Sequence, residues 1–462
     1  MSQFSDLMTR LAPQGWWRLG EPPGGEARDR SAYNIAGTYH DGSVQQQPGA
    51  IADDPDTAVA FSNQAYVEVP DHDIYSLAKA NDGFDRLVLA GWGAADHGGE
   101  WSAQVSHSSY FSCVDGVAVI DEANNSGTWM IGLPIKPYNA DIQIETSWDD
   151  VARGGPLYPC SLVARRQDNG TYYSAQFTEH PDHSLELSIL KHVGGAETLL
   201  AVAPNIGTYA SRDGWFIRFQ VEGPTLRARA WNQSSTQPMT WQVTAVDTSI
   251  SNAGGVSVRS TNSSSKARPT VKFSHFWVQT LGLTVHAFLR VDVPVFTGEG
   301  TNGEHYVHWL GKGERGNQEW AFRLSSQDDS NYPGWVQFYV FNPSGGLGAG
   351  AAYAANRYGQ LQRGKWYQFV GVADSGDLRD LSAGTSIYKD GQLVEGPPLK
   401  TVLYSYYKLT PGNGRAPLRF ATYYKNSFLT GALDEIAIFD RKLTADEIAE
   451  LHVAAIEIIG GI

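Results

Sequence analysis

The sequence is divided into short stretches in which apolar and polar residues alternate, and this division constrains the fold more than any other feature. The stretches are about five to nine residues long and are separated by turn clusters such as DNGT, KDGQ and PGNG. Alternation with a period of two is typical of strands that bury one face, and Gly, Asn and Asp favour tight turns. We expect helices only at residues 3–11, 73–80 and 445–453. The sequence therefore predicts an all-β protein built from antiparallel sandwiches.

The composition argues against several classes of function. The chain of 462 residues carries a formal net charge of −14 and has no basic cluster, so nucleic acid and anionic membrane surfaces are poor partners. No run of about 18 apolar residues is present, and we expect no membrane insertion. The N-terminal stretch lacks a basic segment followed by an apolar core, so we expect no secretory signal. Two cysteines, Cys113 and Cys160, are too few for a disulfide framework and are expected to be buried thiols.

Two stretches of the chain resemble each other and indicate an internal duplication. The segments RDGWFIRFQV (212–221) and RGKWYQFVGV (363–372) each lead a strand with a tryptophan and are each followed by a second strand. We expect Trp215 and Trp366, which begin these strands, to anchor two separate cores. Both copies later end in a strand of similar pattern, VKFSHFWV in the first and ALDEIAIF in the second.

The two copies are not arranged in tandem. Residues 14–81 open a sandwich that continues only at residue 282, whereas residues 82–281 form a self-contained copy. Loops at the ends of sandwiches tolerate inserted domains when the two ends of the insert lie close together. We therefore predict a discontinuous outer domain, 14–81 with 282–453, around an inserted domain, 82–281. Residues 1–13 and 454–462 would be terminal segments.

The outer segments contain the stretches WWRLGE, AVAFSNQAYVEVP and GALDEIAIFDRKLTADEIAELH, and the inserted segment contains CSLVARRQDNGTYYSAQF and GWFIRFQVEGPTLRARAW. Through these stretches the segments resemble known modules. The outer segments resemble a laminin-G-like jelly roll of the concanavalin A type, and the inserted segment resembles a second concanavalin A-like module. The combination resembles minor tail proteins of phages that infect actinobacteria. This resemblance implies a virion protein of the tail tip or fibre, assembled in the host cytoplasm, which contacts other tail-tip proteins and a glycan of the host surface; a trimer is compatible with it.

The sequence offers little support for catalysis. Glycoside hydrolysis needs two carboxyl groups about 5 to 9.5 Å apart across a cleft, and an E-x-D pattern on one strand is the expected signature. No such pattern occurs, and Asp141 and Glu145 in DIQIE would be too far apart. We therefore expect a non-enzymatic protein. Two alternatives stay open: a carbohydrate-binding accessory region of a secreted bacterial glycoside-active enzyme or adhesin, and a purely architectural tail subunit.

Aromatic side chains near the C-terminus are the candidates for sugar binding. Exposed rings flanked by amide and charged groups suit shallow glycan sites, although sandwich cores are aromatic as well. Because the net charge is −14, we expect neutral or weakly charged glycans unless a local basic group intervenes. The candidate residues are Tyr404, Tyr406, Tyr407, Tyr423, Tyr424 and, at a turn, Trp335.

The resemblance also implies one structural calcium ion in the outer domain. The side chain of Asp434 would bind it, together with backbone carbonyls near Gly20 and Ser62. Glu21 and Asp29 could add a carboxylate. The alternative is that Asp434 caps a strand or pairs with Arg441. The inserted copy has Ser274 where the outer copy has Asp434, so we expect no ion there.

Overall fold

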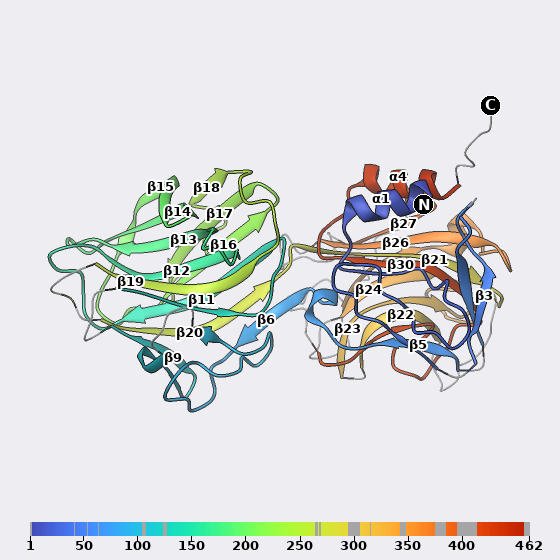
Figure 1. Ribbon diagram of the computed structural model, residues 1–462, viewed down its shortest axis with the longest axis horizontal. Helices are drawn as coiled ribbons and strands as arrows, with labels where there is room; N and C mark the ends of the chain where they lie inside the picture. The colour runs from blue at the N-terminus through green and yellow to red at the C-terminus, as the bar shows by residue number, and fades with distance from the viewer. Residues whose placement is uncertain are drawn as a thin grey trace. The chain divides into compact units, whose positions relative to one another are not determined.

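The computed structural model describes two compact units, Met1–Leu77 with Leu281–Ile462 and Ala78–Thr280. We call them the outer unit and the inserted unit (Figure 1). The nested arrangement of two sandwiches is thereby confirmed. The description leaves out residues 1, 41, 53, 63, 104–107, 123–126, 264–266, 268, 294–304, 315, 342–347, 375–384, 395–413 and 457–462.

The outer unit contains two antiparallel sheets. One has the order β28-β27-β26-β21-β30-β4-β3, with β1 also paired to β30, and the other has the order β2-β5-β29-β22-β23-β24-β25. Their strands are β1 (Gly15–Trp17), β2 (Thr38–His40), β3 (Val44–Pro48), β4 (Thr57–Phe61), β5 (Tyr66–Val69), β21 (Gly282–Val291), β22 (Tyr306–Glu314), β23 (Asn317–Ser325), β24 (Val336–Phe341), β25 (Gly348–Tyr353), β26 (Trp366–Asp374), β27 (Thr385–Lys389), β28 (Gln392–Leu393), β29 (Leu418–Phe420) and β30 (Gly431–Phe439).

The inserted unit repeats this topology strand for strand. Its sheets have the orders β18-β17-β16-β11-β20-β9-β8, with β6 paired to β20, and β15-β14-β13-β12-β19-β10-β7. The predicted duplication is therefore visible in the strand order. The strands are β6 (Ala78–Asp82), β7 (Ser102–Ala103), β8 (Phe111–Val114), β9 (Val117–Asp121), β10 (Gly127–Leu133), β11 (Ala140–Trp148), β12 (Leu157–Arg166), β13 (Tyr172–Glu179), β14 (Ser184–Val193), β15 (Ala196–Thr208), β16 (Trp215–Glu222), β17 (Thr225–Asn232), β18 (Val243–Val246), β19 (Gly255–Asn262) and β20 (Thr270–Gln279).

The two ends of the inserted unit lie side by side. Its first strand, β6, pairs antiparallel with its last, β20, and Ala78 is the partner of Gln279. Directly opposed residues of an antiparallel pair have Cα atoms about 4.5 to 5.5 Å apart. The chain therefore leaves and re-enters the outer unit at nearly the same point, as a tolerated insertion requires.

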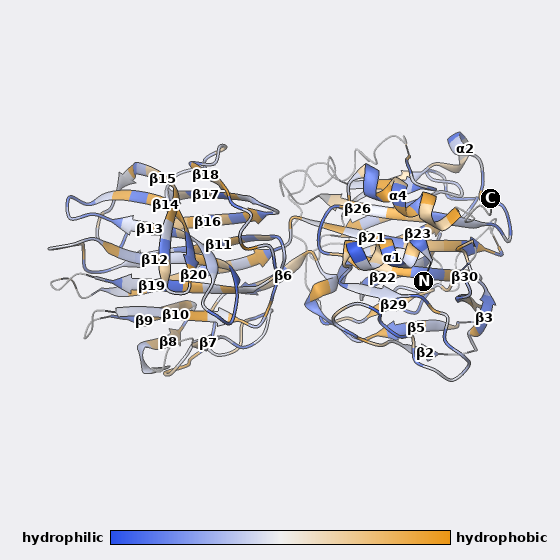
Figure 2. Cartoon of the chain, turned by 45° about the horizontal axis from the view of Figure 1, so that its top comes forward, coloured by the Kyte–Doolittle hydropathy of each residue, from blue (hydrophilic) through white to orange (hydrophobic). Residues whose placement is uncertain are grey.

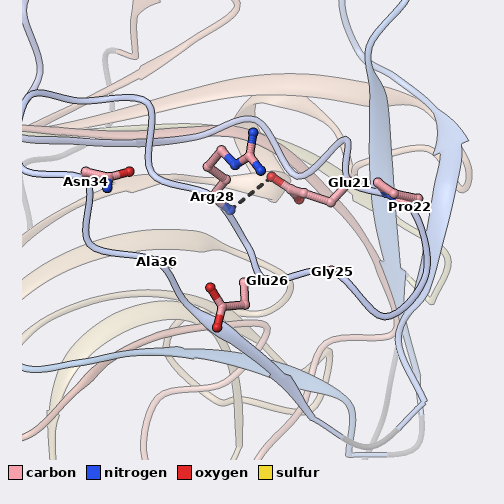
Figure 3. A pocket seen from close by; sticks show the side chains of 7 residues that line it. All are labelled: Glu21, Pro22, Gly25, Glu26, Arg28, Asn34 and Ala36. Carbon is pink, nitrogen blue, oxygen red and sulfur yellow. Dashed lines mark hydrogen bonds between the residues drawn. The ribbon is translucent and has the colours of Figure 1, made fainter.

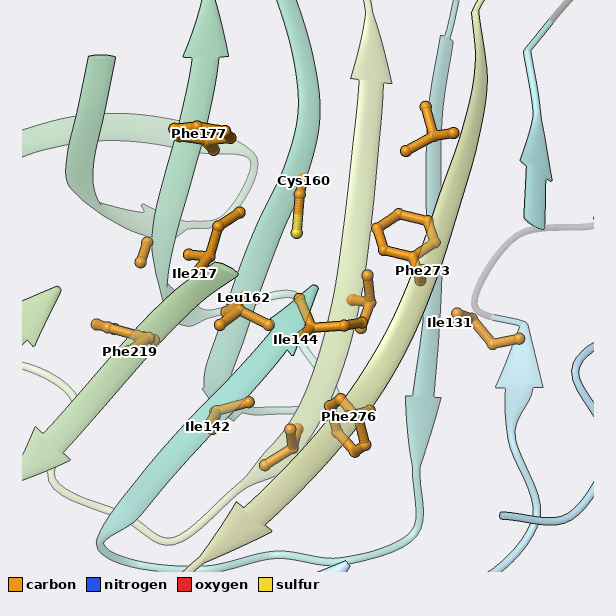
Figure 4. Close-up of a cluster of buried hydrophobic side chains, with 14 of the residues drawn as sticks. Ile131, Ile142, Ile144, Cys160, Leu162, Phe177, Ile217, Phe219, Phe273 and Phe276 are labelled. Carbon is orange, nitrogen blue, oxygen red and sulfur yellow. The ribbon is translucent and has the colours of Figure 1, made fainter. Parts of the chain in front are cut away.

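Alternating side chains of the strands fill the core of the inserted unit. Figure 4 shows Ile142, Leu162, Phe177 and Phe219 pointing into one apolar cluster. Cys160 lies in the same cluster and burial raises the pKa of its thiol. Both cysteines are free and buried, as predicted.

The two strand-leading tryptophans do not occupy the same environment. Trp215 is 5% exposed and belongs to the core of the inserted unit. In the outer unit the core residue is Tyr367, and Trp366 packs from the other face of its sheet, where the Arg290 guanidinium lies 5.4 Å from its ring centroid. The prediction that Trp366 anchors the core between the sheets is therefore wrong. The anchor is the next residue, Tyr367, and adjacent residues of a strand point to opposite faces of its sheet.

Two helices cover the outward face of the sheet that contains β21, β26 and β30 in the outer unit. Helix α1 (Gln3–Leu11) begins at the N-cap Ser2, and α4 (Ala445–Ile456) begins at a capping box, in which Thr444 and Glu447 exchange hydrogen bonds. In Figure 2 both helices carry hydrophobic as well as hydrophilic residues. Their apolar residues form a separate cluster with the sheet: Phe4, Leu7, Met8, Leu11, Ile448 and Leu451 pack with Phe288, Val370 and Phe439.

The remaining helical elements are short. The helix predicted at 73–80 is instead a single 3-10 turn, η1 (Asp73–Tyr75), followed by strand β6. Two others are η2 (Ser108–Tyr110) and α2 (Ala355–Tyr358). No helix within the described ranges is long and apolar enough to cross a membrane.

Candidate functional site

The predicted tyrosine cluster is described only in part. Tyr404, Tyr406 and Tyr407 lie outside the described residues. Tyr423 is completely buried, and its ring lies flat against the sheet because position 311 is a glycine: a Cβ there would be 2.6 Å from the ring carbon Cδ2. Tyr423 therefore offers no exposed face to a sugar, contrary to the prediction. Tyr424 is partly buried and meets Tyr423 edge-on, with ring centroids 5.1 Å apart.

Trp335 is not an exposed platform either. Its side chain is 7% exposed and packs in a small cluster with Ala352, Ala354 and Ala355. The ring of Tyr332 lies 5.1 Å away and covers it further. The turn preceding β24 directs the ring inward, and the predicted role for Trp335 is wrong for that reason.

Asp434 lies in a buried environment with the carboxylates Glu435 and Asp56, both of which pair with the guanidinium of Arg18. It is 3% exposed, and its Oδ2 accepts a hydrogen bond from the backbone N–H of Ala50 at 2.7 Å. Burial, followed by the charges of Glu435 and Asp56, raises the pKa of Asp434 well above its ordinary value. The predicted alternative partner Arg441 instead pairs with Glu447, 2.9 Å away.

The other predicted metal ligands have different partners. Asp29 accepts the N–H groups of Trp16, Ser31 and Ile35 and thereby fixes the loop after β1. Glu21 accepts from the Arg28 N–H and the Tyr39 hydroxyl. Within the described part of the chain, no group of three or more His, Cys, Asp or Glu side chains is placed to hold a metal. Glu21 and Asp29 are thus engaged by other partners, and a calcium ion at Asp434 stays a prediction.

The predicted carbonyl donor at Ser62 is also displaced. Strand β4 pairs with β30 so that Phe61 faces Gly431, which places Ser62 at the far end of the ladder from Asp434. Two glycines make room around the carboxyl groups instead: a Cβ at Gly49 would be 3.1 Å from Asp434 Oδ2, and one at Gly20 would overlap Asp56. Asp56 and the backbone near Gly49 are thus the neighbours of Asp434.

The register supports the expected equivalence of Ser274 and Asp434. Each directly precedes a residue with positive φ, His275 at 51° and Glu435 at 49°, beside a bulge in the last strand. The inserted unit nevertheless keeps a carboxylate there, because Glu145 faces Ser274 and accepts its hydroxyl hydrogen at 2.9 Å.

Figure 3 shows a polar pocket between the loops that connect β1 and β2 in the outer unit. The cavity has a volume of about 450 Å³, and its charged lining comes from Glu21, Glu26 and Arg28. The backbone N–H of Arg28 holds the Glu21 carboxylate at 2.9 Å. No aromatic ring is among the lining residues, so this pocket offers polar contacts without a stacking surface.

A second polar surface covers the outer face of one sheet in the inserted unit. Leu162 and Ala175 point into the core, so their neighbours Ser161 and Ser174 point to the outer face. The register continues this face across four strands, since Ser161 lies opposite both Gln176 and Arg259. We call it the serine face; its residues are Ser161, Ser174, Gln176, Thr178, Ser188, Ser257 and Arg259 of β12, β13, β14 and β19.

One end of the serine face carries an aromatic pair. Tyr172 stacks on His192 with ring centroids 4.1 Å apart and planes 20° apart. The His192 Nε2 and the Ser174 hydroxyl are hydrogen-bonded at 3.0 Å. Burial, and then the charge of Arg259, lower the pKa of His192 to about 4. His192 is therefore neutral at pH 7.

Several polar groups of the serine face have no hydrogen-bond partner within the described part of the chain. They are the hydroxyls of Ser257 and Thr178 and the Nε and Nη1 atoms of Arg259. Ser257 is 1% and Thr178 is 3% exposed. Buried polar groups are normally satisfied, so each exception calls for an explanation. A bound ligand with hydroxyl and oxygen acceptor groups would supply the missing partners.

Two carboxylates near the serine face each lie close to a different histidine. Glu197 lies 3.6 Å from His192, and Glu186 lies 3.4 Å from His180.

The sequence interpretation missed the serine face because serines at alternate strand positions look like ordinary solvent-facing residues. The signal that could have revealed it is the repetition of this pattern in neighbouring strands, SLVARR, YYSAQF and LELSIL.

Comparison with known proteins identifies the fold of part of the chain. Residues 265–449 match the family described as the concanavalin A-like lectin/glucanases superfamily. The carbohydrate-binding module CBM66 from Bacillus subtilis is 13% identical, with a TM-score of 0.28, over 35% of this chain and 86% of that chain. A legume lectin-like domain from Entamoeba histolytica is 11% identical, with a TM-score of 0.30, over 38% of this chain and 88% of that chain.

Part of a larger protein also resembles this chain in structure. A xylan β-1,4-xylosidase from Bacillus halodurans C-125 is 14% identical, with a TM-score of 0.33, and the match covers 43% of this chain but only 39% of the xylosidase. The search of curated proteins found no match. The chain thus contains a concanavalin A-like jelly roll, in agreement with its two-sheet topology.

Proposed function

We propose that this protein is a phage minor tail protein of the tail tip or fibre, which attaches to a glycan of the host surface through the serine face. The observation that carries the binding proposal is the set of buried, unpartnered polar atoms on Ser257, Thr178 and Arg259. These atoms lie on the outer face of the sheet, and a ligand would reach them by displacing the side chains that bury them. The phage assignment rests on the resemblance of the sequence modules.

The chemistry of the face suits a sugar. Hydroxyl groups donate and accept hydrogen bonds, as sugar hydroxyls do, and the guanidinium of Arg259 donates to oxygen atoms. Tyr172, beside the face, supplies part of an aromatic ring. Because these hydroxyls make no internal hydrogen bond, none has to be broken when they bind; both are buried, so side chains around them must move to admit a ligand.

A single isosteric substitution tests this role. Thr178→Val removes a hydroxyl that makes no hydrogen bond in the protein, so the fold is expected to keep its stability while glycan binding weakens. Thr146→Val is the matched control, because its hydroxyl is also buried and unpartnered but lies on β11 of the opposite sheet. Equal loss of glycan-array signal in both variants, or in neither, would contradict binding at the serine face.

We propose recognition without catalysis. Glu197 and Glu186 are engaged with separate histidines, at 3.6 Å and 3.4 Å, rather than paired across a common cleft. Polymeric glycans incubated with the protein are expected to show no new reducing ends. Release of products that disappears in a Glu197→Gln variant would instead identify a glycosidase.

The location and the partners are tested on particles. We expect the protein in purified virions, cross-linked to other tail-tip proteins and, if it is a trimer, to two further copies of itself. Recovery only from culture medium, without particles, would favour the accessory region of a secreted enzyme or adhesin. Presence in particles without any glycan or cell binding would favour a purely architectural subunit.

We also propose that the outer unit binds one calcium ion at Asp434, with Asp56 in place of Glu21 and Asp29. The fit rests on a buried carboxyl group with negative neighbours and on the space left by Gly49 and Gly20. Calcium would compensate the negative charge that Arg18, which already pairs with Asp56 and Glu435, leaves at this point. A chelator is expected to lower the melting temperature of the wild type but not of Asp434→Asn; the same shift in both proteins would reject the site.

A further inference from the structure

The two units carry an outward-facing arginine at corresponding places in corresponding sheets. Arg259 lies on β19, between β12 and β10, and Arg419 lies on β29, between β22 and β5. Both therefore project from the same strand of the same topology. The residue opposite each arginine differs: Arg419 faces Glu68, whereas Arg259 faces Met130.

Arg419 is saturated by internal partners. Its Nε donates to the Glu68 carboxylate at 2.8 Å, its Nη1 to the Tyr423 carbonyl at 2.8 Å, and its Nη2 to the Glu314 carboxylate at 3.1 Å. The side chain is 5% exposed. A fourth, longer hydrogen bond of 3.5 Å joins Nη1 to the Gly313 carbonyl, so four of its five N–H donors have internal acceptors and this arginine is a structural residue.

Arg259 has no comparable partners. Its Nε and Nη1 are buried without a hydrogen bond, and its nearest carboxylate, Glu197, lies 3.9 Å from Nη1, beyond hydrogen-bonding distance. The side chain is 12% exposed, and that of Glu197 is 46% exposed. The side chain thus keeps a small exposed part, through which a ligand would approach the guanidinium. Glu197 partly offsets the positive charge of the guanidinium, and His192 is uncharged at pH 7.

We propose that Arg259 binds the carboxylate of an acidic sugar, so that the serine face selects glycans containing uronic acid residues. This inference rests on the proposed glycan-binding function and names the class of glycan. A guanidinium presents its donors in a rigid planar fork that matches the two oxygens of a carboxylate, and charge-assisted hydrogen bonds of this kind are the strong ones. In the outer unit the equivalent arginine meets an internal carboxylate, Glu68, at the position where the inserted unit leaves a methionine.

The negative net charge of the protein does not oppose this local contact. Charges at the surface are screened over about 8 Å at physiological ionic strength, whereas a carboxylate bound to Arg259 would be in direct contact. The expectation of neutral glycans, which followed from the net charge, is therefore replaced by a preference set by one side chain.

The test compares pairs of ligands that differ only in the carboxylate. Oligosaccharides of galacturonate, glucuronate and mannuronate, and their carboxyl-reduced counterparts, are titrated against the full chain. For at least one pair, the wild type is expected to bind the acidic form about tenfold more tightly, which corresponds to about 1.4 kcal/mol. Arg259→Gln is expected to abolish the difference, and Arg259→Lys to keep only part of it, because lysine lacks the planar fork.

Two further variants separate binding from folding. Met130→Glu reproduces the arrangement of the outer unit, so an internal carboxylate should occupy Arg259 and remove the acidic preference. Arg419→Gln is the matched control: it should lower the melting temperature, because it removes the donors of four hydrogen bonds, and leave the preference intact. The melting temperature of Arg259→Gln should fall less than that of Arg419→Gln.

The outcomes distinguish this inference from the proposed function. Equal binding of acidic and reduced oligosaccharides, or a preference that survives in Arg259→Gln, would overturn the role of Arg259 while glycan binding stands. Binding of no oligosaccharide, and no signal on a glycan array or on host cells, would overturn the proposed function and this inference with it.

Discussion

The protonation of Glu122 makes a sharp prediction about stability. Glu122 is 1% exposed in the inserted unit, and its carboxyl group accepts a hydrogen bond from the Ser260 hydroxyl at 2.5 Å. Burial, with a smaller effect of the Asp121 charge, raises the pKa of Glu122 to about 8, against the lowering effect of Ser260. The side chain is therefore protonated in the folded protein at pH 7. We predict that Glu122→Gln, which is neutral at every pH, removes a pH dependence of unfolding.

The sign and size follow from proton linkage. Above pH 4.5 the unfolded chain releases a proton that the folded protein holds until about pH 8, so the free energy of unfolding falls as pH rises through this window. One pKa unit corresponds to about 1.36 kcal/mol, so the full contribution is roughly 5 kcal/mol, present below pH 4.5 and lost above pH 8. This is a large part of the stability of an ordinary domain, about 5 to 15 kcal/mol.

Urea denaturation between pH 5 and pH 9 measures the effect. The wild type should lose several kcal/mol relative to Glu122→Gln as pH rises. The control is Glu222→Gln, which removes a half-exposed carboxylate of the same unit from its ion pair with Arg227 and should shift the curve by less than about 1 kcal/mol. If the unfolding free energies of the wild type and Glu122→Gln run parallel over this pH range, Glu122 is ionised in the folded protein and the reasoning is refuted.

Three further predictions concern the architecture. Replacement of residues 78–280 by a short Gly-Ser linker should leave an outer unit that unfolds cooperatively by circular dichroism, because the replaced ends are paired neighbours; a molten product would refute independent folding. Gly311→Val should lower the unfolding free energy by about 1 to 3 kcal/mol or more, because its side chain would collide with the Tyr423 ring; unchanged stability would show that this ring moves freely. Lys312→Met should cost about 3 to 5 kcal/mol, because the Lys312 Nζ lies 2.7 Å from the Glu319 carboxylate and the methionine would leave that buried group unpaired. The double variant with Glu319→Gln should recover much of this loss, and no recovery would exclude the charge as the cause.

The sequence by itself determined the fold class, the nesting and the last helix. Local patterns indicate these features: alternation with a period of two, turn residues between strands, and Thr444 followed three residues later by Glu447. Each depends on the conformational preferences of a few neighbouring residues, so it can be recognised before any long-range contact is known. The duplication was visible for the same reason, because both copies repeat their strand patterns in the same order.

Only the tertiary structure decided which side chains are exposed and which polar groups are satisfied. Trp366 faces helices α1 and α4, which come from the two ends of the chain, whereas its neighbour Tyr367 faces the core. Tyr423 is buried because its ring lies against Gly311, over a hundred residues away in the sequence. Arg259 and Arg419 cannot be distinguished in the sequence. Their hydrogen bonding differs because Met130 lies opposite Arg259 and Glu68 lies opposite Arg419 on the adjacent strands. Burial and hydrogen bonding are properties of contacts between distant segments, and a local pattern does not contain them.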